Sequence, residues 1–495
     1  MRPINPLLLI DFYKAGHRAQ YPEDTTLVYS NFTPRVSRVP GVESMVFYGL
    51  QYAVQEYLID RFGRDFFARP KAEVVDEYRD FMDCTLGPGA VACDHIEALW
   101  DLGYLPVEIR ALPEGTHVPM GVPALTIHNT QPDFFWLPNY LETLLSCLLW
   151  KPCTTATTAG QFFQNFIRYA EATGGDLGFV PFQGHDFSFR GMSLPEDGIV
   201  SGSAHLLWFT GTDTVPAIRF HELYYGADRH RELVGCSVSA TEHSVMSAGG
   251  NDQEFETYKR LLTEVYPHGI VSIVSDTWDF WAVVTDFLPR LKGEILARGE
   301  NAPTAMNKLV IRPDSGVPHK IINGDPTADT PWERLGLVRC LDEVFGHTVN
   351  AQGYRVLHPA VGFIYGDAIT VDEQVRILEG LKANGYATTC GVLGVGSFSY
   401  QMVTRDTYGT VCKATYCEID GEGRELFKNP KTGGWKKSHR GLLRVNDDLS
   451  VSQGVSWAEA QTGLLEPVFR DGVLLRTHTL AEIRARVRDG VSAPR

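Results

Sequence analysis

From about residue 178 to residue 400, one pattern recurs along the chain. A short apolar, β-branched run ends in glycine or a charged residue, and a helical pattern follows it. The run "GIVSIVSD" ends at Asp276, "KLVIRPDSG" carries Asp314 near its end, and "AVGFIYGD" ends at Asp367. Continuous apolar runs of this kind are typical of parallel strands that are buried on both faces. Because parallel strands need crossover connections, the pattern predicts an α/β fold.

The segments between these runs carry helix signals. In "TVDEQVRILEGLKANGY", Thr370 and Glu373 predict a capping box, Leu378 and Leu381 share one face, and Gly385 marks the end. The runs in "GFVPFQGHDF", "GTD", "CSVSATEH" and "ATTCGVLGVGS" follow the same rule at the spacing of βα units. We therefore expect an irregular (β/α) barrel whose polar strand ends point into one mouth and whose apolar side chains fill the barrel core.

The parts of the chain outside this region have a different pattern. A length of 495 residues exceeds what one hydrophobic core usually supports. The helical stretch "VFYGLQYAVQEYLIDRFG" and the strand-like "GYLPVEIRALPEGTHV" precede the barrel region, with turn signals between them. We predict a (β/α) barrel catalytic domain over 156–399 and a discontinuous flanking α/β domain made of 1–155 and 400–495.

The charge and the apolar segments of the chain limit its partners. With 60 acidic and 45 basic residues the net charge is −15, which disfavours binding to nucleic acid and to anionic membranes. The most apolar window, "YLETLLSCLLW", is too short to cross a bilayer, and the N-terminus has no signal-peptide h-region. Nine cysteines without a C-x-x-C pair suit reduced, buried thiols. These features predict a cytoplasmic protein with no nucleic-acid and no membrane partner.

Polar and aromatic residues at the predicted barrel mouth suit a phosphorylated sugar joined to a planar heterocycle. Arg190 and Arg312 offer guanidinium groups to phosphate oxygens. Asp314 and Asp367 are suited to accept hydrogen bonds from sugar hydroxyls or to hold water bound to Mg2+. Phe187, within "HDFSFRG", offers a flat apolar face to an aromatic ring.

Each of these features also has a simpler interpretation. The aromatic residues of "HDFSFRG" suit the edge of a core beside a solvated Arg190, and a strand-end aspartate often only caps the next helix. Gly394 and Gly396 of "GVGS" suit either a tight turn or a backbone contact with phosphate. The basic segment 427–441 suits a solvated hairpin tip as well as a phosphate-binding loop. Capping alone does not explain polar ends on seven successive runs.

A series of motifs occurs in the order, and at nearly the spacing, seen in the nicotinamide phosphoribosyltransferases. They are "NPLLLIDFYKAGH", "VFYGLQY", "HDFSFRG", "GTDTV", "TEHS", "VSDTWD", "IRPDSG", "GD" and "TRD". The chain resembles the bacterial members of that family over almost its whole length. The resemblance implies a type II phosphoribosyltransferase that converts nicotinamide and phosphoribosyl pyrophosphate into nicotinamide mononucleotide and pyrophosphate. It also implies a requirement for Mg2+, hydrolysis of ATP as co-substrate, and a homodimer with shared active sites.

The motif matches imply a role for each site residue. Phe187 would stack on one face of the nicotinamide ring and Tyr13 of a second subunit on the other, while Asp213 would accept a hydrogen bond from the carboxamide NH2. His243 matches the histidine that the family phosphorylates, with Asp276 orienting it. Catalysis is implied for His243, Asp276 and Asp314; substrate contacts for Arg190, Arg312, Gly366, Asp367, Gly396 and Ser397; and phosphate contacts across the dimer interface for Arg35, Arg405, Lys413, Lys428 and Lys436.

Two positions depart from the family pattern. Ser397 replaces a glycine of the three-glycine run found in animal relatives, and Val411 replaces a hydroxyl residue found in some members. Phosphate contacts in this part of the chain are therefore expected to differ in detail.

Other functions fit the residues less well. A nicotinate phosphoribosyltransferase would share the fold, but Asp213 would repel the carboxylate of nicotinate. A scaffold protein without turnover would not need the intact set of site residues, and a glycosidase using Asp314 and Asp367 leaves the basic residues without a role. For Asp213 the simpler alternative is a cap of the next helix, and for His243 it is a helix N-terminal residue satisfied by Asp276.

Overall fold

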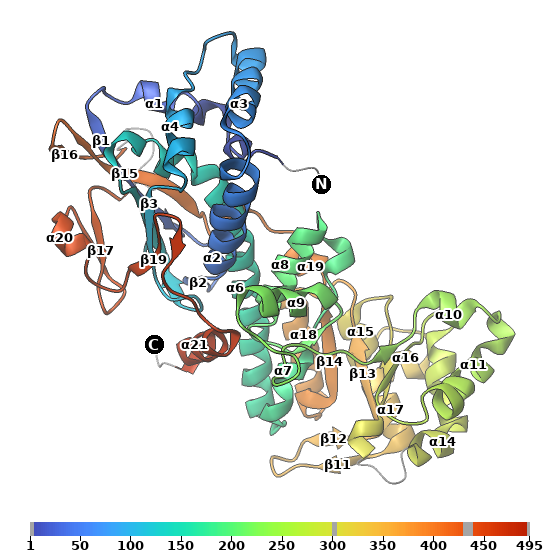
Figure 1. Ribbon diagram of the computed structural model, residues 1–495. Coiled ribbons are helices and arrows are strands. Elements are labelled where there is room, and N and C mark those ends of the chain that lie inside the picture. The colour runs from blue at the N-terminus through green and yellow to red at the C-terminus, as the bar shows by residue number, and fades with distance from the viewer. Residues whose placement is uncertain (1–3, 299–303, 429–438, 493–495) are drawn as a thin grey trace. The chain divides into compact units, whose positions relative to one another are not determined.

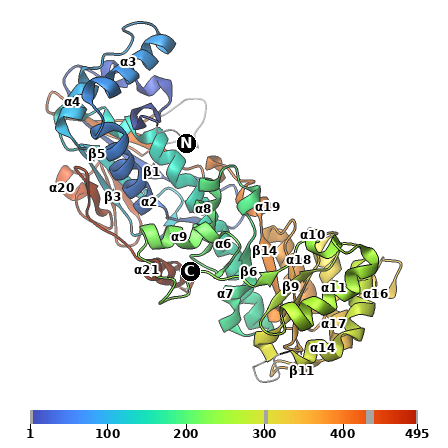
Figure 2. The same cartoon turned by 45° about the vertical axis from the view of Figure 1, so that its right-hand side comes forward.

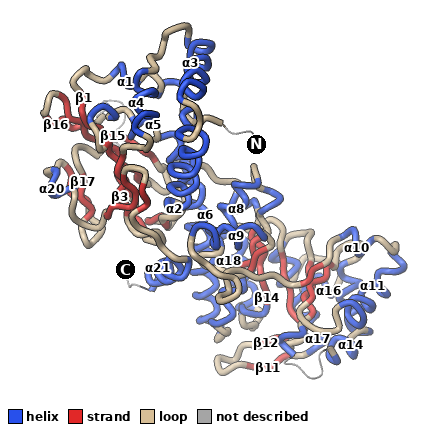
Figure 3. The backbone as a smooth tube through the Cα atoms, viewed as in Figure 1, coloured by secondary structure: helices blue, strands red, loops and turns tan. Residues whose placement is uncertain are grey.

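The protein is described by a computed structural model that covers residues 4–298, 304–428 and 439–492. The chain groups into two compact units, each built around its own sheet (Figures 1 and 3). Unit 1 contains Met1–Thr157, His221–Ala227 and Val403–Arg495, and unit 2 contains Thr158–Phe220 and Asp228–Met402.

Unit 2 is built on a seven-stranded parallel sheet in the order β7-β6-β14-β13-β10-β9-β8. At one edge of the sheet, Gly211 of β7 also forms a parallel bridge with Cys236. The chain runs from Cys236 into β8, the strand at the opposite edge, so the sheet curves towards closure. The predicted parallel α/β barrel architecture is confirmed. The strands are β6 (Gly184–Asp186), β7 (Gly211–Thr212), β8 (Ser239–Ala240), β9 (Val271–Val274), β10 (Leu309–Arg312), β13 (Val361–Tyr365) and β14 (Gly391–Val395), with a separate hairpin of β11 (His347–Val349) and β12 (Arg355–Leu357).

Helices connect the parallel strands and surround them, as Figure 2 shows around β6, β9 and β14. Apolar runs become strands here because one face packs against the surrounding helices and the other points into the interior of the curved sheet. The helices of unit 2 are α7 (Val180–Gln183), α8 (Pro195–His205), α9 (Val215–Tyr224, which extends into unit 1), α10 (His243–Ser247), α11 (Glu254–Arg260), α12 (Phe280–Ala282), α13 (Leu288–Arg290), α14 (Lys292–Ala297), α15 (Pro318–Asn323), α16 (Pro331–Leu335), α17 (Leu337–Phe345), α18 (Val371–Ala383) and α19 (Ser397–Tyr400).

Helix α18 confirms the helix predicted after Thr370 but forms only half of the expected capping box. The Oγ1 atom of Thr370 accepts a hydrogen bond from the N–H of Glu373 (3.2 Å). The Glu373 carboxylate bonds instead to the backbone N–H (3.0 Å) and the ring Nδ1 (2.7 Å) of His319. Because this carboxylate joins α18 to α15, it does not serve the N-terminus of its own helix.

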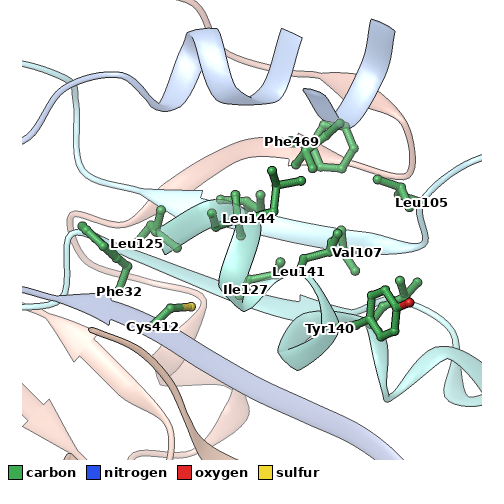
Figure 4. Packing of buried hydrophobic residues seen from close by; sticks show 14 of the residues in the cluster. Phe32, Leu105, Val107, Leu125, Ile127, Tyr140, Leu141, Leu144, Cys412 and Phe469 are labelled. Atoms are coloured by element: carbon green, nitrogen blue, oxygen red, sulfur yellow. The ribbon is translucent and has the colours of Figure 1, made fainter. Parts of the chain in front are cut away.

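Unit 1 contains a seven-stranded antiparallel sheet in the order β16-β15-β1-β5-β3-β19-β20. Its core packs sheet residues such as Val107, Ile127 and Phe469 against Leu141 and Leu144, all of them buried (Figure 4). In the described residues, no helix has the length and apolar character needed to cross a membrane. The strands are β1 (Thr25–Thr33), β3 (Val107–Ala111), β5 (Leu125–Asn129), β15 (Val411–Ile419), β16 (Glu422–Glu425), β19 (Glu466–Arg470) and β20 (Val473–Leu474), with a separate two-stranded sheet of β2 (Ser44–Val46) and β4 (His117–Pro119) and a hairpin of β17 (Leu443–Val445) and β18 (Val451–Gln453). The helices are α1 (His17–Gln20), α2 (Leu50–Tyr52), α3 (Lys71–Leu86), α4 (Asp94–Leu102), α5 (Leu137–Tyr140), α6 (Glu142–Thr173, which continues into unit 2), α20 (Trp457–Ala460) and α21 (Leu480–Ser492).

The segment His221–Ala227 groups with unit 1, although the sequence assigns it to the barrel domain over 156–399. Tyr225 is fully buried, its hydroxyl donates to the Glu114 carboxylate (3.0 Å), and its ring lies 5.2 Å from that of Tyr48. The same carboxylate accepts hydrogen bonds from two backbone N–H groups, while burial raises the pKa of Glu114. These buried contacts join residues far apart in sequence and leave no periodic signal, so the sequence pattern does not show them.

Candidate active site

A cavity of about 720 Å³ lies within the ring of parallel strands in unit 2. Its volume is in the range of small-molecule pockets. The prediction that apolar side chains fill the barrel core is therefore wrong at its centre. Small residues at lining positions leave the space open, among them Gly211, Ala240 and Ser272. Every strand of the sheet contributes to the lining: His185 from β6, Gly211 from β7, Ala240 from β8, Ser272 from β9, Val310 and Arg312 from β10, Ile364 from β13 and Val392 from β14.

Phe187 lines this cavity directly after β6, where its N–H donates to the carbonyl of Val395 (3.0 Å). Its ring covers two glycines: a Cβ added at Gly366 would lie 2.5 Å from the ring, and one added at Gly394 only 2.2 Å. Both positions are closed to a side chain while the ring keeps its place. Gly394, considered from the sequence as a phosphate contact, thus serves to make room for Phe187. The ring of His185 is tilted against Phe187 at a centroid distance of 4.9 Å.

Asp213 lines the same cavity after β7. Its Oδ1 accepts hydrogen bonds from Nε2 of His185 (2.9 Å) and Oγ of Ser237 (2.7 Å). Burial acts to raise the pKa of Asp213, but His185, Ser237 and the charge of Arg312 outweigh burial and hold the pKa below its usual value. The side chain is ionised at neutral pH and 48% exposed. Within the described residues its hydrogen bonds go to His185 and Ser237, not to the N-terminus of α9, which disfavours the helix-cap interpretation.

His243 begins α10, and half of its side chain surface is exposed. Its Nδ1 shares a hydrogen bond with Oγ1 of Thr277 (3.0 Å). Its Nε2 lies 3.8 Å from Oδ1 of Asp276, which allows an ion-pair attraction but exceeds a normal hydrogen-bond length. The structure therefore brings the predicted pair together, while Thr277 makes the hydrogen bond that orients the imidazole.

Three carboxylates gather after the neighbouring strands β9, β10 and β13. Asp276 accepts a hydrogen bond from the N–H of Asp314 (2.9 Å) through Oδ2, while its Oδ1 is buried and has no hydrogen-bond partner among the described residues. Burial raises the pKa of Asp314; Arg312 opposes this shift, and the charges of Asp276 and Asp367 add to it. This acceptor-rich group suits hydroxyl donors or a cation.

The three carboxylates also suit a Mg2+ site in which a substrate supplies some of the remaining ligands. Within the described parts of the chain, no three His, Cys, Asp or Glu side chains lie close enough to hold a metal ion by themselves. Mg2+ is commonly bound by one or two carboxylates, substrate phosphates and waters. Asp276, Asp314 and Asp367 are the candidates for this incomplete set.

The turn that follows Phe187 lies against the predicted glycine loop. Arg190 is exposed within the 3-10 turn Phe189–Gly191. A Cβ added at Gly191 would lie 2.6 Å from the side chain of Ser397, the first residue of the one-turn helix α19. Gly396 precedes this helix as its N-cap. The structure thus brings Arg190, Gly396 and Ser397 to one side of unit 2.

A basic cluster in unit 1, defined here as Arg35, Lys413 and Lys428, gathers part of the predicted phosphate-binding set. Arg35 follows β1, and its Nε donates to the carbonyl of Gly409 (3.0 Å). Lys413 lies in β15, the strand that pairs with β1. Burial lowers the pKa of Lys413, and the charges of Lys428 and Arg35 lower it further. These cations are therefore neighbours, although they come from distant parts of the sequence.

Tyr13 and Arg405, two further residues of the flanking domain that are predicted to contact the substrates, also lie in unit 1. Tyr13 lies in the 3-10 turn Phe12–Lys14 with 59% of its surface exposed. Arg405 begins the 3-10 turn Arg405–Thr407 and pairs with its neighbour Asp406 (3.3 Å). Lys436 lies outside the described residues.

Sequence reasoning missed a carboxylate that positions the site. Asp186 is fully buried at the end of β6, where Oδ1 accepts hydrogen bonds from the N–H (2.9 Å) and Oγ (2.7 Å) of Ser188. Its Oδ2 accepts from Oγ1 of Thr214 (2.6 Å) and of Thr212 (3.2 Å). Asp186 therefore ties the strand end that carries Phe187 to the one that carries Asp213. The signal in the sequence is a charged residue inside an apolar strand end, where burial demands partners. Ser237 and Thr277 were also missed, since single hydroxyls leave no pattern.

Comparisons with known proteins agree on one family. The model described as "Nicotinate phosphoribosyltransferase (NAPRTase) family" matches residues 182–461, and "Nicotinamide phosphoribosyltransferase, N-terminal domain" matches residues 5–68. The nicotinamide phosphoribosyltransferase of Acinetobacter baylyi is 52% identical over 98% of this chain and 97% of its own length. That of Xanthomonas campestris is 34% identical over 97% of both chains.

Solved structures extend the comparison to the fold. Human nicotinic acid phosphoribosyltransferase matches with a TM-score of 0.59 at 18% identity, covering 97% of this chain and 93% of that chain. Nicotinate-nucleotide pyrophosphorylase from Pyrococcus furiosus matches with a TM-score of 0.58 at 13% identity, covering 99% and 96%. At these identities the likeness shows a shared type II phosphoribosyltransferase fold. Together with the sequence relatives and family models, it shows that the chain belongs to the nicotinamide phosphoribosyltransferases, within the NAPRTase family.

Proposed function

We propose that this chain transfers the phosphoribosyl group of phosphoribosyl pyrophosphate to nicotinamide, giving nicotinamide mononucleotide and pyrophosphate. One observation carries the proposal: an ionised Asp213 lies in the same small-molecule cavity as the ring of Phe187. A carboxylate accepts a hydrogen bond from a carboxamide NH2, and a phenyl ring stacks on a pyridine. Both of these groups serve nicotinamide, and the relatives matched over nearly the whole chain are nicotinamide phosphoribosyltransferases.

The reaction requires positioning and charge neutralisation more than a strong base. The neutral pyridine nitrogen is itself the nucleophile, and it bonds to C1 of the ribose as the C1–O bond to pyrophosphate breaks. Arg190 and Arg312 supply positive charge for the leaving group, while Asp314 and Asp367 accept hydrogen bonds from the ribose hydroxyls. Mg2+ bound through the substrate phosphates would supply further neutralisation of charge.

ATP enters the proposal as a co-substrate that phosphorylates His243. When Nδ1 donates its proton to Thr277, Nε2 keeps the lone pair that attacks the γ-phosphorus of ATP. The new N–P bond forms as the P–O bond to ADP breaks. Asp276, 3.8 Å from Nε2, stabilises the positive charge that develops on the ring.

A second copy of the chain completes each site in this proposal. Tyr13 and the basic cluster belong to unit 1, whereas the cavity, Asp213 and His243 belong to unit 2. We propose a homodimer in which unit 1 of one copy supplies Tyr13 and the basic cluster to the cavity of the other. Such a dimer contains two shared sites.

Activity in mixed dimers provides a direct test of shared sites. A chain with Tyr13→Ala and Arg405→Ala and a chain with His243→Ala and Asp314→Ala are each expected to lose ATP-stimulated synthesis. After dissociation and mixing, one of the two hybrid sites carries none of the substitutions, so activity is expected to return. The measurement is ATP-stimulated mononucleotide synthesis before and after mixing. Full activity of the unmodified protein in a strictly monomeric preparation would contradict the shared site.

The proposed reaction is tested by a coupled assay with nicotinamide and nicotinate in parallel, each with and without ATP. We expect mononucleotide from nicotinamide, a higher rate with ATP, and much less product from nicotinate. Equal or greater use of nicotinate would overturn the substrate assignment. An unchanged rate with ATP would overturn the co-substrate role while leaving the transfer reaction in place.

A Gly394→Ala substitution is expected to weaken nicotinamide binding. The added Cβ would lie 2.2 Å from the ring of Phe187 and 2.8 Å from the Cα of Gly366, so the ring has to move. Forced repacking typically costs about 1–3 kcal/mol, which corresponds to a KM for nicotinamide raised about 5- to 150-fold if the whole cost falls on binding. Gly293→Ala in α14 is the matched control, since nothing lies within 4 Å of its added Cβ. Equal KM values for the two variants would show that the ring position does not matter.

A further inference from the structure

The turn that carries Tyr13 is held against the end of α5 and the start of α6 by three contacts, all within unit 1. The buried ammonium of Lys14, 3% exposed, forms an ion pair with the Glu142 carboxylate. The Thr143 hydroxyl donates to the carboxylate of Asp11 (2.7 Å). The Tyr140 hydroxyl donates to the carbonyl of Leu7 (2.6 Å). The segment around Tyr13 is therefore fixed at several points to one short stretch, residues 140–143.

The ammonium group of this ion pair also lies close to the exposed ring of Tyr13. The Lys14 ammonium lies 5.1 Å from the centroid of the Tyr13 ring, within the range of a cation–π interaction. The ring of His17 is tilted against that of Tyr13 at a centroid distance of 5.3 Å. Tyr13 itself is 59% exposed, so these contacts hold the ring while leaving much of it free to meet a ligand.

Glu142 also acts on the basic cluster. Burial and the charges of Lys428 and Arg35 lower the pKa of Lys413, and the negative charge of Glu142 opposes this lowering. One carboxylate is therefore close to the ammonium that supports Tyr13 and to a cation of the predicted phosphate-binding set.

We propose that Glu142 is a positioning residue that holds Lys14, and through it the ring of Tyr13, in a fixed place next to the basic cluster. An unpaired buried ammonium is costly, so Lys14 keeps its position only while the carboxylate is present. The aromatic contact and the phosphate contacts that unit 1 supplies are thereby joined into one preformed element. This inference rests on the proposed function, in which Tyr13 stacks on nicotinamide in a partner's cavity.

The test compares Glu142→Gln with Tyr13→Ala and with the double variant in the full-length protein. Because stacking on an aromatic ring contributes to ligand binding, each single substitution is expected to raise the KM for nicotinamide about tenfold, with kcat largely retained. If Glu142 acts through Tyr13, adding Glu142→Gln to the Tyr13→Ala variant is expected to raise the KM for nicotinamide by less than about twofold. An equal fold-change in both backgrounds would overturn the proposal, as would an unchanged KM in Glu142→Gln.

A control variant separates positioning from general stability. Lys71→Met breaks the exposed Lys71–Asp101 ion pair (2.6 Å) of the same unit and is expected to change neither KM nor hydrogen exchange near Tyr13. A rise in KM for Lys71→Met equal to that for Glu142→Gln would indicate a general structural effect and overturn the assignment.

A measurement independent of turnover distinguishes failure of this inference from failure of the proposed function. Backbone hydrogen exchange of residues 5–17 is expected to be faster in Glu142→Gln and unchanged in Lys71→Met, with the core strands of unit 1 protected in both. Unchanged exchange in Glu142→Gln would overturn the positioning role. If exchange responds as expected but the unmodified protein makes no mononucleotide, the proposed function fails while the Lys14–Glu142 contact still holds the turn.

Discussion

ATP hydrolysis is expected to be lost in a His243→Ala variant, while slow, ATP-independent synthesis of nicotinamide mononucleotide remains. Removing a covalent nucleophile typically costs at least about a thousandfold in rate. The cavity residues Phe187 and Asp213 are unchanged in this variant, so nicotinamide still has its proposed binding groups. The measurement is the release of ADP and of mononucleotide in the same reaction, together with acid-labile label on the protein from γ-labelled ATP.

Two further variants show whether the imidazole acts as the phosphoacceptor. His230→Ala removes an exposed histidine of unit 2 that does not line the cavity, and it is expected to keep both activities. Thr277→Val keeps the His243 nucleophile but removes the 3.0 Å hydrogen bond to Nδ1, so ATP hydrolysis is expected to fall about tenfold. Wild-type ATP hydrolysis in His243→Ala would favour the simpler interpretation of this residue as part of a helix terminus.

The choice of nicotinamide over nicotinate is expected to be reduced or lost in Asp213→Ala. The unmodified carboxylate accepts from the carboxamide NH2 and repels the carboxylate of nicotinate. Losing a hydrogen bond to a charged group costs about 1.5–3 kcal/mol, roughly one to two powers of ten in kcat/KM for nicotinamide. Relief of the repulsion is expected to raise kcat/KM for nicotinate. The ratio of the two kcat/KM values is the decisive quantity.

The surroundings of Asp213 also predict its controls and its pH dependence. Asp213→Asn keeps the shape and removes the charge, so it should shift the ratio towards nicotinate without a large change in melting temperature. Because the pKa of Asp213 lies below its usual value, the preference should be constant through neutral pH and decline only in acid, as the carboxylate gains a proton. A lowered melting temperature with an unchanged substrate ratio would support the helix-cap interpretation instead.

The part of the fold that could be predicted from the sequence is the part encoded by local patterns. The apolar runs before Asp276, Asp314 and Asp367 form parallel strands β9, β10 and β13, because burial on both faces demands continuous apolar residues. The segment His221–Ala227 groups with unit 1, and this grouping depends on the buried contact of Tyr225 with Glu114, which no local pattern encodes. Helix signals do not report which sheet a segment packs against.

The amino-acid sequence by itself determined the parallel α/β fold, the family, and which strand ends carry Phe187, Asp213 and His243, because these depend on residue order and local burial. Tertiary structure alone decided the open cavity, the sharing of Asp213 between His185 and Ser237, and the hydrogen bond between Thr277 and His243. It also decided that Lys14 pairs with Glu142. The physical reason is that hydrogen bonds, ion pairs and cavities depend on distances between side chains from separate elements, and folding sets those distances.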